Sequence, residues 1–422
     1  MVLSSLVYSP AILCTLFSAL AFSPSVAAQG DSSQECTPYY YAPVGDQKAN
    51  FPTSWTVATI VPGDTEAQTM FESIQSQIPN ISPKGQQPQS LTGNWSGFTY
   101  DPSDPDCWWT WQKCTTPKAA GLPDDISMLP EPNVLGYGFD DGPNCSHNAF
   151  YDYLKSKDQT ATMFYIGSNV MDWPLEAQRA LADGHQVCAL TALTNDQAFA
   201  EFWYTMKIIK LAIGVTPTCW RPPYGDVDDR IRFIANALGL TNIMWQYDSN
   251  DWRVGTNNIT STDVDNNYLD LINAAKNGTF STHGTIMLTH ELNNFTMSEV
   301  VKFYDQLASA FSYMVPIGVA FNVSDPYIEG GYSLPSFDQY ASGTHVGSIT
   351  GNGTNNGGPF ASLTNGTSGG SSGGSSFGGS GTSGGTSSSN SSNKSGAAKV
   401  SLDGAGYFAG VLGLVGGIMT ML

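Results

Sequence analysis

Two adjacent carboxylates, Asp140 and Asp141, end an apolar run and precede a Gly-Pro turn. Neighbouring residues at a strand end point to opposite sides, so the two acids can take different roles. One can hold a metal ion while the other accepts a proton. Asp-Asp-Gly-Pro is also good turn chemistry, so these two residues alone leave a solvated turn equally open.

An arginine held between rigid neighbours is the second candidate. Arg221 precedes two prolines, and their ring constraints suit it to pairing with a buried carboxylate. The turn that follows at Tyr224 could present a backbone N–H to an oxyanion. These residues therefore suit hydrolytic chemistry, in which a carboxylate must be oriented and a negative charge stabilised.

Further acids and a histidine follow two later apolar runs. Asp248, Asp251 and Trp252 stand at the end of one run. His290 ends the other, and Leu288, two residues earlier, shares its face of the strand. A histidine at such a position can act as a general acid, because a nearby carboxylate raises its pKa and keeps it protonated.

From Asn133 onward, apolar runs of strand length alternate with amphipathic segments of helix length. The expected strands are 133–139, 161–167, 185–190, 241–248, 284–290 and 317–322. The expected helices are 147–157, 173–184, 195–214, 228–239, 267–278 and 297–314. This alternation predicts an α/β fold whose parallel strands close into a distorted (β/α) barrel. The candidate residues follow successive strands, so they should meet at one mouth of that barrel.

The segments FDDGP (139–143), RPPYG (221–225), DSNDW (248–252) and LTHE (288–291) occur in this order. Together they resemble the polysaccharide deacetylase family, also described as the NodB-homology domain or carbohydrate esterase family 4. With its flanking regions, the chain is similar to fungal cell-wall chitin deacetylases. The resemblance implies a barrel of the NodB type over residues 133–335. It also implies metal-dependent removal of acetyl groups from chitin, which yields chitosan and acetate.

The resemblance assigns roles to the catalytic residues. Asp140 matches the base that activates water, and Arg221 would orient it. His290 matches the acid that protonates the leaving amine, and Asp251 would tune its pKa.

The remaining matches concern binding. Asp141 matches a carboxylate ligand of a divalent metal, zinc or cobalt. Tyr224 would offer its backbone N–H to the tetrahedral intermediate. Trp252 and Leu288 would line the pocket for the acetyl methyl group.

One motif of the family is missing. A histidine pair spaced His-x-x-x-His normally follows a Gly-His dipeptide and a short strand. Here Gly184 and His185 are present, but no pair follows. Without a gap, Leu190 and Thr194 replace the ligands; with a gap, a short segment carrying both histidines is absent. Thr194 begins a helix-capping box, Thr-x-x-Gln, which favours the gap.

A single carboxylate against water is a weak site for a divalent ion. Three explanations stay open: a skipped coding stretch, a chitin-binding pseudoenzyme, or an unexpected ligand that preserves activity. A glycoside hydrolase also uses paired acids, but it leaves RPPYG without a role.

The two ends of the chain predict its location. Residues 1–28 read as a secretory signal peptide. Residues 342–398, rich in Ser, Gly and Thr, predict a disordered stalk. Residues 396–422 read as the propeptide of a GPI anchor attached at Ser395. We therefore expect a secreted protein, GPI-anchored to the plasma membrane and cell wall.

The composition narrows the partners. A net charge of −19 argues against nucleic acids as partners and suits a neutral or cationic polysaccharide. We expect the protein to be a monomer. Six cysteines outside the signal predict three disulfides of open pairing. The segment 107–114, CWWTWQKC, could close one small loop within the N-terminal extension, 29–132. Its aromatic rings either pack against the domain or form a platform for sugars.

Overall fold

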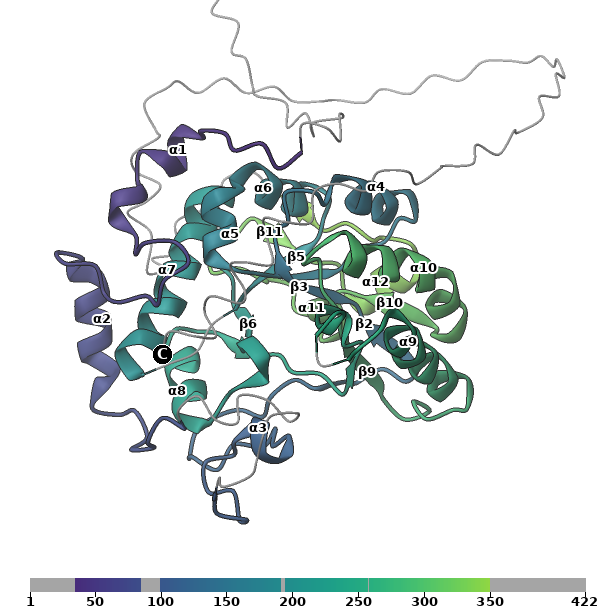
Figure 1. Ribbon diagram of the computed structural model, residues 1–422, viewed down its shortest axis with the longest axis horizontal. Helices are drawn as coiled ribbons and strands as arrows, with labels where there is room; N and C mark the ends of the chain where they lie inside the picture. Colours follow the sequence, from purple (N-terminus) through teal and green to yellow (C-terminus); the bar gives the residue numbers. More distant parts are fainter. Residues whose placement is uncertain (1–34, 85–98, 191–193, 257, 350–422) are drawn as a thin grey trace, which may run out of the picture. The chain divides into compact units, whose positions relative to one another are not determined.

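The computed structural model describes residues 35–84, 99–190, 194–256 and 258–349 (Figure 1). The predicted signal peptide (1–28), the anchor propeptide (396–422) and its attachment residue Ser395 lie outside these residues. Among the described residues, no helix combines the length and apolar character that crossing a membrane would require.

Five parallel strands form the first sheet, in chain order. Each is short and largely buried, and successive strands are separated by helical crossovers, as parallel pairing requires. The strands are β3 (Gly138–Gly142), β4 (Thr162–Tyr165), β5 (Gln186–Leu190), β6 (Cys219–Arg221) and β7 (Thr241–Asn242).

The second sheet is built around β9 (Gly284–Leu288). Parallel neighbours of β9 are β2 (Val134–Gly136) and β8 (Tyr247–Asp248), and β2 also pairs with β10 (Tyr313–Val315). The antiparallel strand β1 (Met128–Leu129) pairs with β9 ahead of the predicted domain start at 133.

Single bridges join the two sheets. Asp140, in β3, bridges His290, which follows β9, and Ile126 bridges Ile243, which follows β7. Strands β2 and β3 are separated only by Tyr137. The predicted α/β fold is confirmed: two largely parallel sheets, joined by single bridges, follow one another in the order of a distorted (β/α) barrel.

Helices cover the outside of the barrel (Figure 1). They are α4 (Asn148–Ser156), α5 (Gly167–Asp172), α6 (Pro174–Ala182), α7 (Asn195–Ile213), α8 (Asp229–Ala237), α9 (Ser261–Lys276) and α10 (Asn294–Ala310). Helix α9 starts six residues before the predicted 267–278 helix, because Thr260 and Asp263 form a capping box there.

The predicted strand at 317–322 is wrong. Residues Ile317–Ala320 form helix α11, and the strand is β10, before Pro316. Side chains of β4 and β5 accept the first amides of this helix: Thr162 from Ile317 at 2.8 Å and Gln186 from Gly318 at 2.9 Å. Periodicity in a short apolar run could not reveal these contacts.

The predicted stalk begins too early. Residues 342–349 belong to the fold, because β12 (Ser348–Ile349) pairs with β11 (Tyr332–Ser333). His345 also contacts the carboxylate of Asp158 at 2.8 Å. The rest of the predicted 342–398 stalk lies outside the described residues. The smaller elements are η1 (Lys48–Asn50), α3 (Trp109–Gln112), η2 (Pro223–Gly225), η3 (Asp251–Arg253) and α12 (Phe337–Ala341).

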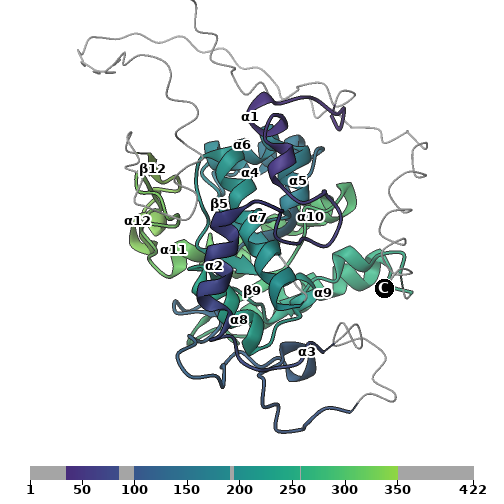
Figure 2. The same ribbon diagram turned by 90° about the vertical axis from the view of Figure 1, so that its left-hand side faces the viewer.

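The N-terminal extension runs along α7. Helices α1 (Ala42–Gly45) and α2 (Thr65–Gln75) lie beside α7, and α2 crosses in front of it in Figure 2. Asp64 pairs with Lys207 of α7 at 2.7 Å, which anchors the start of α2. The six cysteines form the three predicted disulfides, Cys36–Cys145, Cys107–Cys114 and Cys188–Cys219.

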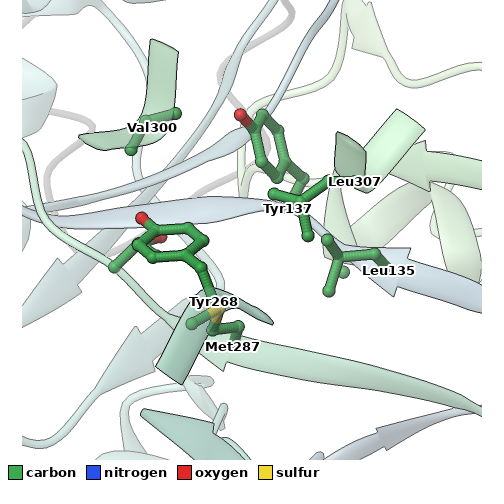
Figure 3. A pocket seen from close by; sticks show the side chains of 8 residues that line it. Leu135, Tyr137, Tyr268, Met287, Val300 and Leu307 are labelled. Atoms are coloured by element: carbon green, nitrogen blue, oxygen red, sulfur yellow. The ribbon is translucent and has the colours of Figure 1, made fainter. Parts of the chain in front are cut away.

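A small gap remains in the core between the second sheet and helices α9 and α10 (Figure 3). Leu135, Tyr137, Tyr268 and Met287 contribute to its lining. The hydroxyl groups of the two tyrosines have no hydrogen-bond partner among the described residues. No charged side chain reaches this gap, so it belongs to the packing of the core and offers no catalytic group.

Candidate active site

Asp140 and Arg221 form a buried ion pair at the ends of β3 and β6. The Nη1 atom of Arg221 donates to Oδ1 of Asp140 at 2.6 Å. Arg221 also donates through Nε to the carbonyl of Ile243 at 3.2 Å, and its guanidinium lies 3.9 Å from the ring centroid of Phe164. Because the guanidinium is held on several sides, it fixes the orientation of the Asp140 carboxylate.

His290 and Asp251 form a second pair. The Nδ1 atom of His290 lies 2.6 Å from Oδ1 of Asp251, and the His290 amide donates to Oδ2 at 3.1 Å. The amide of Trp252 donates to the same carboxylate at 2.9 Å. These bonds orient the imidazole and leave its Nε2 atom for a substrate.

The two pairs lie on neighbouring strands. The amide of Asp140 donates to the carbonyl of Thr289 at 2.9 Å, and the amide of Glu291 donates to the carbonyl of Asp140 at 3.0 Å. Asp140 and His290 are therefore bridge partners although 150 positions separate them in the sequence. The structure brings a candidate base and a candidate acid to the same mouth.

Charge and burial set the protonation of this site. Burial raises the pKa of Asp140, while the positive charges of Arg221 and His290 oppose the rise. Burial would lower the pKa of His290, but the charge and hydrogen bond of Asp251 outweigh it and raise that pKa to about 10. His290 is thus protonated at neutral pH, as a general acid must be.

Replacing Asp251 by Asn should lower the pKa of His290 from about 10, because burial then disfavours the imidazolium and only the charges of Asp141 and Asp140 still oppose it. A raised folded-state pKa stabilises the fold fully below about pH 6.5, and this stabilisation is lost as the pH rises to about 10. NMR titration of the ring and denaturant unfolding across this range would measure both effects. Identical pH profiles of parent and variant would contradict the assignment.

Asp141 lies near the end of β3, where the register of the strand shifts between Asp140 and Gly142. Its backbone is left-handed, with φ of 70°, and Asn169 of α5 donates to its carbonyl at 2.8 Å. Burial at the mouth raises the pKa of its carboxyl to about 6, and the nearby charge of His290 opposes that rise. The charges of Asp140, Asp251 and Glu291 add to this rise. A bound cation would therefore offset the repulsion between Asp141 and these carboxylates.

The remaining ligands of a metal are missing. Within the described ranges, no group of three His, Cys, Asp or Glu side chains could hold an ion. Strand β5 ends at Leu190, and Thr194 caps α7 with the predicted capping box, so the connection between them is short. Residues 191–193 lie outside the described residues, and their sequence is Thr-Ala-Leu.

The other histidines of the chain have structural environments elsewhere. The buried His147 ring stacks on Tyr151 at 3.8 Å. His185 accepts a hydrogen bond from the amide of Ala161 at 3.1 Å. His283 contacts the carbonyl of Gly284, and His345 contacts Asp158. The side chains of this chain therefore do not fit a divalent catalytic ion.

The predicted binding residues form a rim beside His290. Tyr224 has a left-handed backbone, with φ of 57°, and its side chain is 65% exposed. Its ring lies 6.4 Å from that of Trp252, which lies 6.5 Å from the ring of His290. Leu288, the last residue of β9 and two residues before His290, is buried. The rim leaves an aromatic surface next to the candidate acid.

The predictions from sequence missed what supports the RPPYG turn. Trp109 packs against Gly225, where an added Cβ would lie 2.3 Å from the indole. Trp108 donates through Nε1 to Asp226 at 2.6 Å, across 118 residues of sequence. The disulfide loop 107–114 therefore packs against the domain, and this alternative is confirmed over the sugar platform. Only the cysteine spacing hinted at the loop, and nothing in the sequence indicated its partner.

Comparison with known proteins identifies the family of this chain. Residues 130–243 match the family model for polysaccharide deacetylases. Chitin deacetylase 2 of Cryptococcus neoformans var. grubii is 52% identical over 77% of this chain and 74% of its own length. Chitin deacetylase of Amylomyces rouxii is 44% identical, over 71% and 73% respectively.

A solved structure gives a further comparison. The chitin deacetylase from the fungal pathogen Colletotrichum lindemuthianum is 22% identical, with a TM-score of 0.43, and the match covers 48% of this chain and 92% of that one. The two curated relatives are similar over more than two thirds of their length. On that similarity, the chain belongs to the polysaccharide deacetylase family.

Proposed function

We propose that the protein is of the chitin deacetylase class, whose reaction hydrolyses the N-acetyl groups of chitin to acetate and chitosan, and that turnover requires the two histidines that the printed sequence lacks. The observation that carries this proposal is the bridge between Asp140 and His290, each held by its own partner of opposite charge. The 52% identity to a chitin deacetylase, over about three quarters of both chains, supports chitin as the substrate.

Amide hydrolysis needs a base, an acid and stabilisation of an oxyanion. Asp140, oriented by Arg221, would accept a proton from the attacking water. His290, kept protonated by Asp251, would donate a proton to the leaving nitrogen. The backbone N–H of Tyr224 would stabilise the oxyanion.

The acetyl methyl group requires an apolar contact near the reacting carbon. Trp252 and Leu288 are the candidates, because they lie beside His290 on the same rim and strand. A pocket of this kind would distinguish an acetylated sugar from one that carries a free amine.

In this family a divalent metal, zinc or cobalt by resemblance, would polarise the amide carbonyl and lower the pKa of water. Among the described residues, Asp141 has no further metal ligands grouped with it. That observation favours a second candidate function, a wall protein that binds chitin at the same residues without hydrolysing it.

The location is also part of the proposal. We propose a secreted monomer, held at the plasma membrane and cell wall by a GPI anchor at Ser395. Three disulfides, typical of secreted proteins, support the oxidising compartment. The order of the segments 1–28, 342–398 and 396–422 supports the anchor.

Selective binding of acetylated oligomers tests the proposed function without requiring turnover. Isothermal titration should detect chitotetraose and give much weaker binding of its fully deacetylated counterpart and of cellotetraose. The comparison needs physiological salt or above, because the charge of −19 attracts cationic chitosan non-specifically. Equal binding of all three oligomers, or binding of none, would refute the proposal.

A further inference from the structure

Trp55 is an exposed tryptophan in the N-terminal extension, outside the region that carries the family motifs. Its side chain is 47% exposed, and no other tryptophan of the described residues is among the exposed large hydrophobic side chains. A single exposed hydrophobic residue is common on protein surfaces, so the position of Trp55 and the bonds that fix it carry the argument.

The position of Trp55 is held from both ends. Its amide donates to Oγ of Ser168 and its indole Nε1 donates to Oδ2 of Asp172, each at 3.0 Å. Its backbone is left-handed, with φ of 63°, a conformation that a bulky residue rarely adopts. These two bonds occupy the polar atoms and leave the faces of the ring available.

Helix α5 connects Trp55 to the catalytic turn. Ser168 and Asp172 both belong to α5, which follows β4 at the mouth of the barrel. Asn169, between them, donates to the carbonyl of Asp141 at 2.8 Å. One short helix, α5, therefore contacts both the Trp55 indole and the backbone of Asp141.

The strand order places Trp55 and the aromatic rim on opposite sides of the site. Around the mouth, β4 pairs with β3, the segment after β3 bridges the segment after β9, and β9 pairs with β8. Asp140 and His290 follow the two central strands of this series. Trp55 lies beside α5 at one end, and Trp252 follows β8 at the other.

This arrangement suits an extended polymer. Aromatic rings offer a large, rigid apolar face at little conformational cost, and the C–H face of a pyranose ring is the matching surface of a sugar. A chain whose reacting unit lies between Asp140 and His290 extends past the site in both directions. Contacts with remote units add binding energy that the reacting unit alone cannot supply.

We propose that Trp55 forms a remote subsite that stacks on a pyranose ring of the chitin chain and favours long oligomers over short ones. The ligand is the polymer of the proposed function, so this inference rests on that function. The subsite places the N-terminal extension in substrate recognition, whereas the motifs of the barrel carry the chemistry.

Replacement of Trp55 by Ala tests the subsite through binding. Isothermal titration should show about tenfold weaker binding of chitohexaose, the typical loss when an anchoring aromatic side chain is truncated. Binding of chitobiose should not change, because its two sugar units cover only the reacting position and one neighbouring position. Trp55→Phe should retain most of the affinity, since it keeps an aromatic face.

Two controls make the result specific. Tyr313→Ala removes another exposed ring, 40% accessible, at the start of β10 and so away from the mouth. Its affinity for both oligomers should equal that of the parent. Far-ultraviolet circular dichroism and the unfolding midpoint would show that the variants keep their fold.

The outcomes separate the subsite from the function. Unchanged chitohexaose binding by Trp55→Ala would overturn the subsite while the proposed function stands. If Trp55→Ala weakened the binding of chitobiose and chitohexaose equally, the effect would not depend on oligomer length, and the subsite would also be overturned. The same holds if Tyr313→Ala weakened chitohexaose binding as much as Trp55→Ala does, because the effect would not depend on which exposed ring is removed. A parent protein that binds neither oligomer would refute the proposed function, and the subsite with it.

Discussion

Expressed with the printed sequence, the protein should bind no stoichiometric zinc or cobalt and should release no acetate from chitin oligomers. The reason is the donor set: in the described part of the chain no group of three ligands surrounds Asp141, and one carboxylate does not retain a divalent ion in water. Metal analysis after dialysis and an enzymatic assay for acetate would measure both quantities. One tightly bound equivalent of metal would contradict this expectation.

Restoring the missing ligands is the matched experiment. A short segment with two histidines spaced His-x-x-x-His, inserted between Ala189 and Thr194, should bring one equivalent of zinc or cobalt. Acetate release should rise by roughly two orders of magnitude or more, because the remaining groups of the site are in place. The same segment with alanines at both positions is the control. Activity in that control would show that the loop acts by something other than its histidines.

Replacing Arg221 by Ala should lower the free energy of unfolding by about 3–5 kcal/mol, because it leaves a buried carboxylate unpaired. Arg221 is fully buried and Asp140 is 4% exposed, so water does not reach the carboxylate freely. Denaturant unfolding followed by circular dichroism would give the difference.

A double variant distinguishes the ion pair from simple loss of packing. Arg221→Met combined with Asp140→Asn removes both charges, so it should be much more stable than Arg221→Ala. Lys155→Ala, which removes an exposed lysine from Asp183 while Arg179 still pairs with that carboxylate, should cost far less. If all three variants lost similar stability, the pair would not be the interaction that matters.

The convergence of the site could be predicted because parallel strands deliver their carboxyl ends to one mouth. Asp140, Arg221, Asp251 and His290 each follow a different strand, and no side-chain contact was needed to bring them together. The sequence did not predict that Asp140 and His290 would be direct bridge partners. It depends on how the two sheets meet, which hydrophobic periodicity does not report.

Other features depend on contacts between distant residues. The pairing of the cysteines was open, because six cysteines allow many combinations with similar spacing. The packing of Trp109 on Gly225 and the bonds of Trp55 to α5 join segments that lie more than 100 positions apart. The strand expected at 317–322 is a helix because neighbouring strands supply its first hydrogen-bond acceptors.

The absence of the histidine pair, in contrast, was readable from the sequence. The capping box expected at Thr194 is present at the start of α7, and β5 ends at Leu190, which stays in favour of the gapped alignment. The capping box joins Thr194 and Gln197, which are only three residues apart, so it can be predicted without knowing any contact between distant residues.

A crystal structure of the protein with chitotetraose bound tests the central claim most directly. The account predicts one sugar unit at the mouth, with its amide nitrogen within hydrogen-bonding distance of Nε2 of His290 and its carbonyl carbon facing Asp140. Oligomer bound away from these two residues, or a mouth in which their side chains face different cavities, would contradict it.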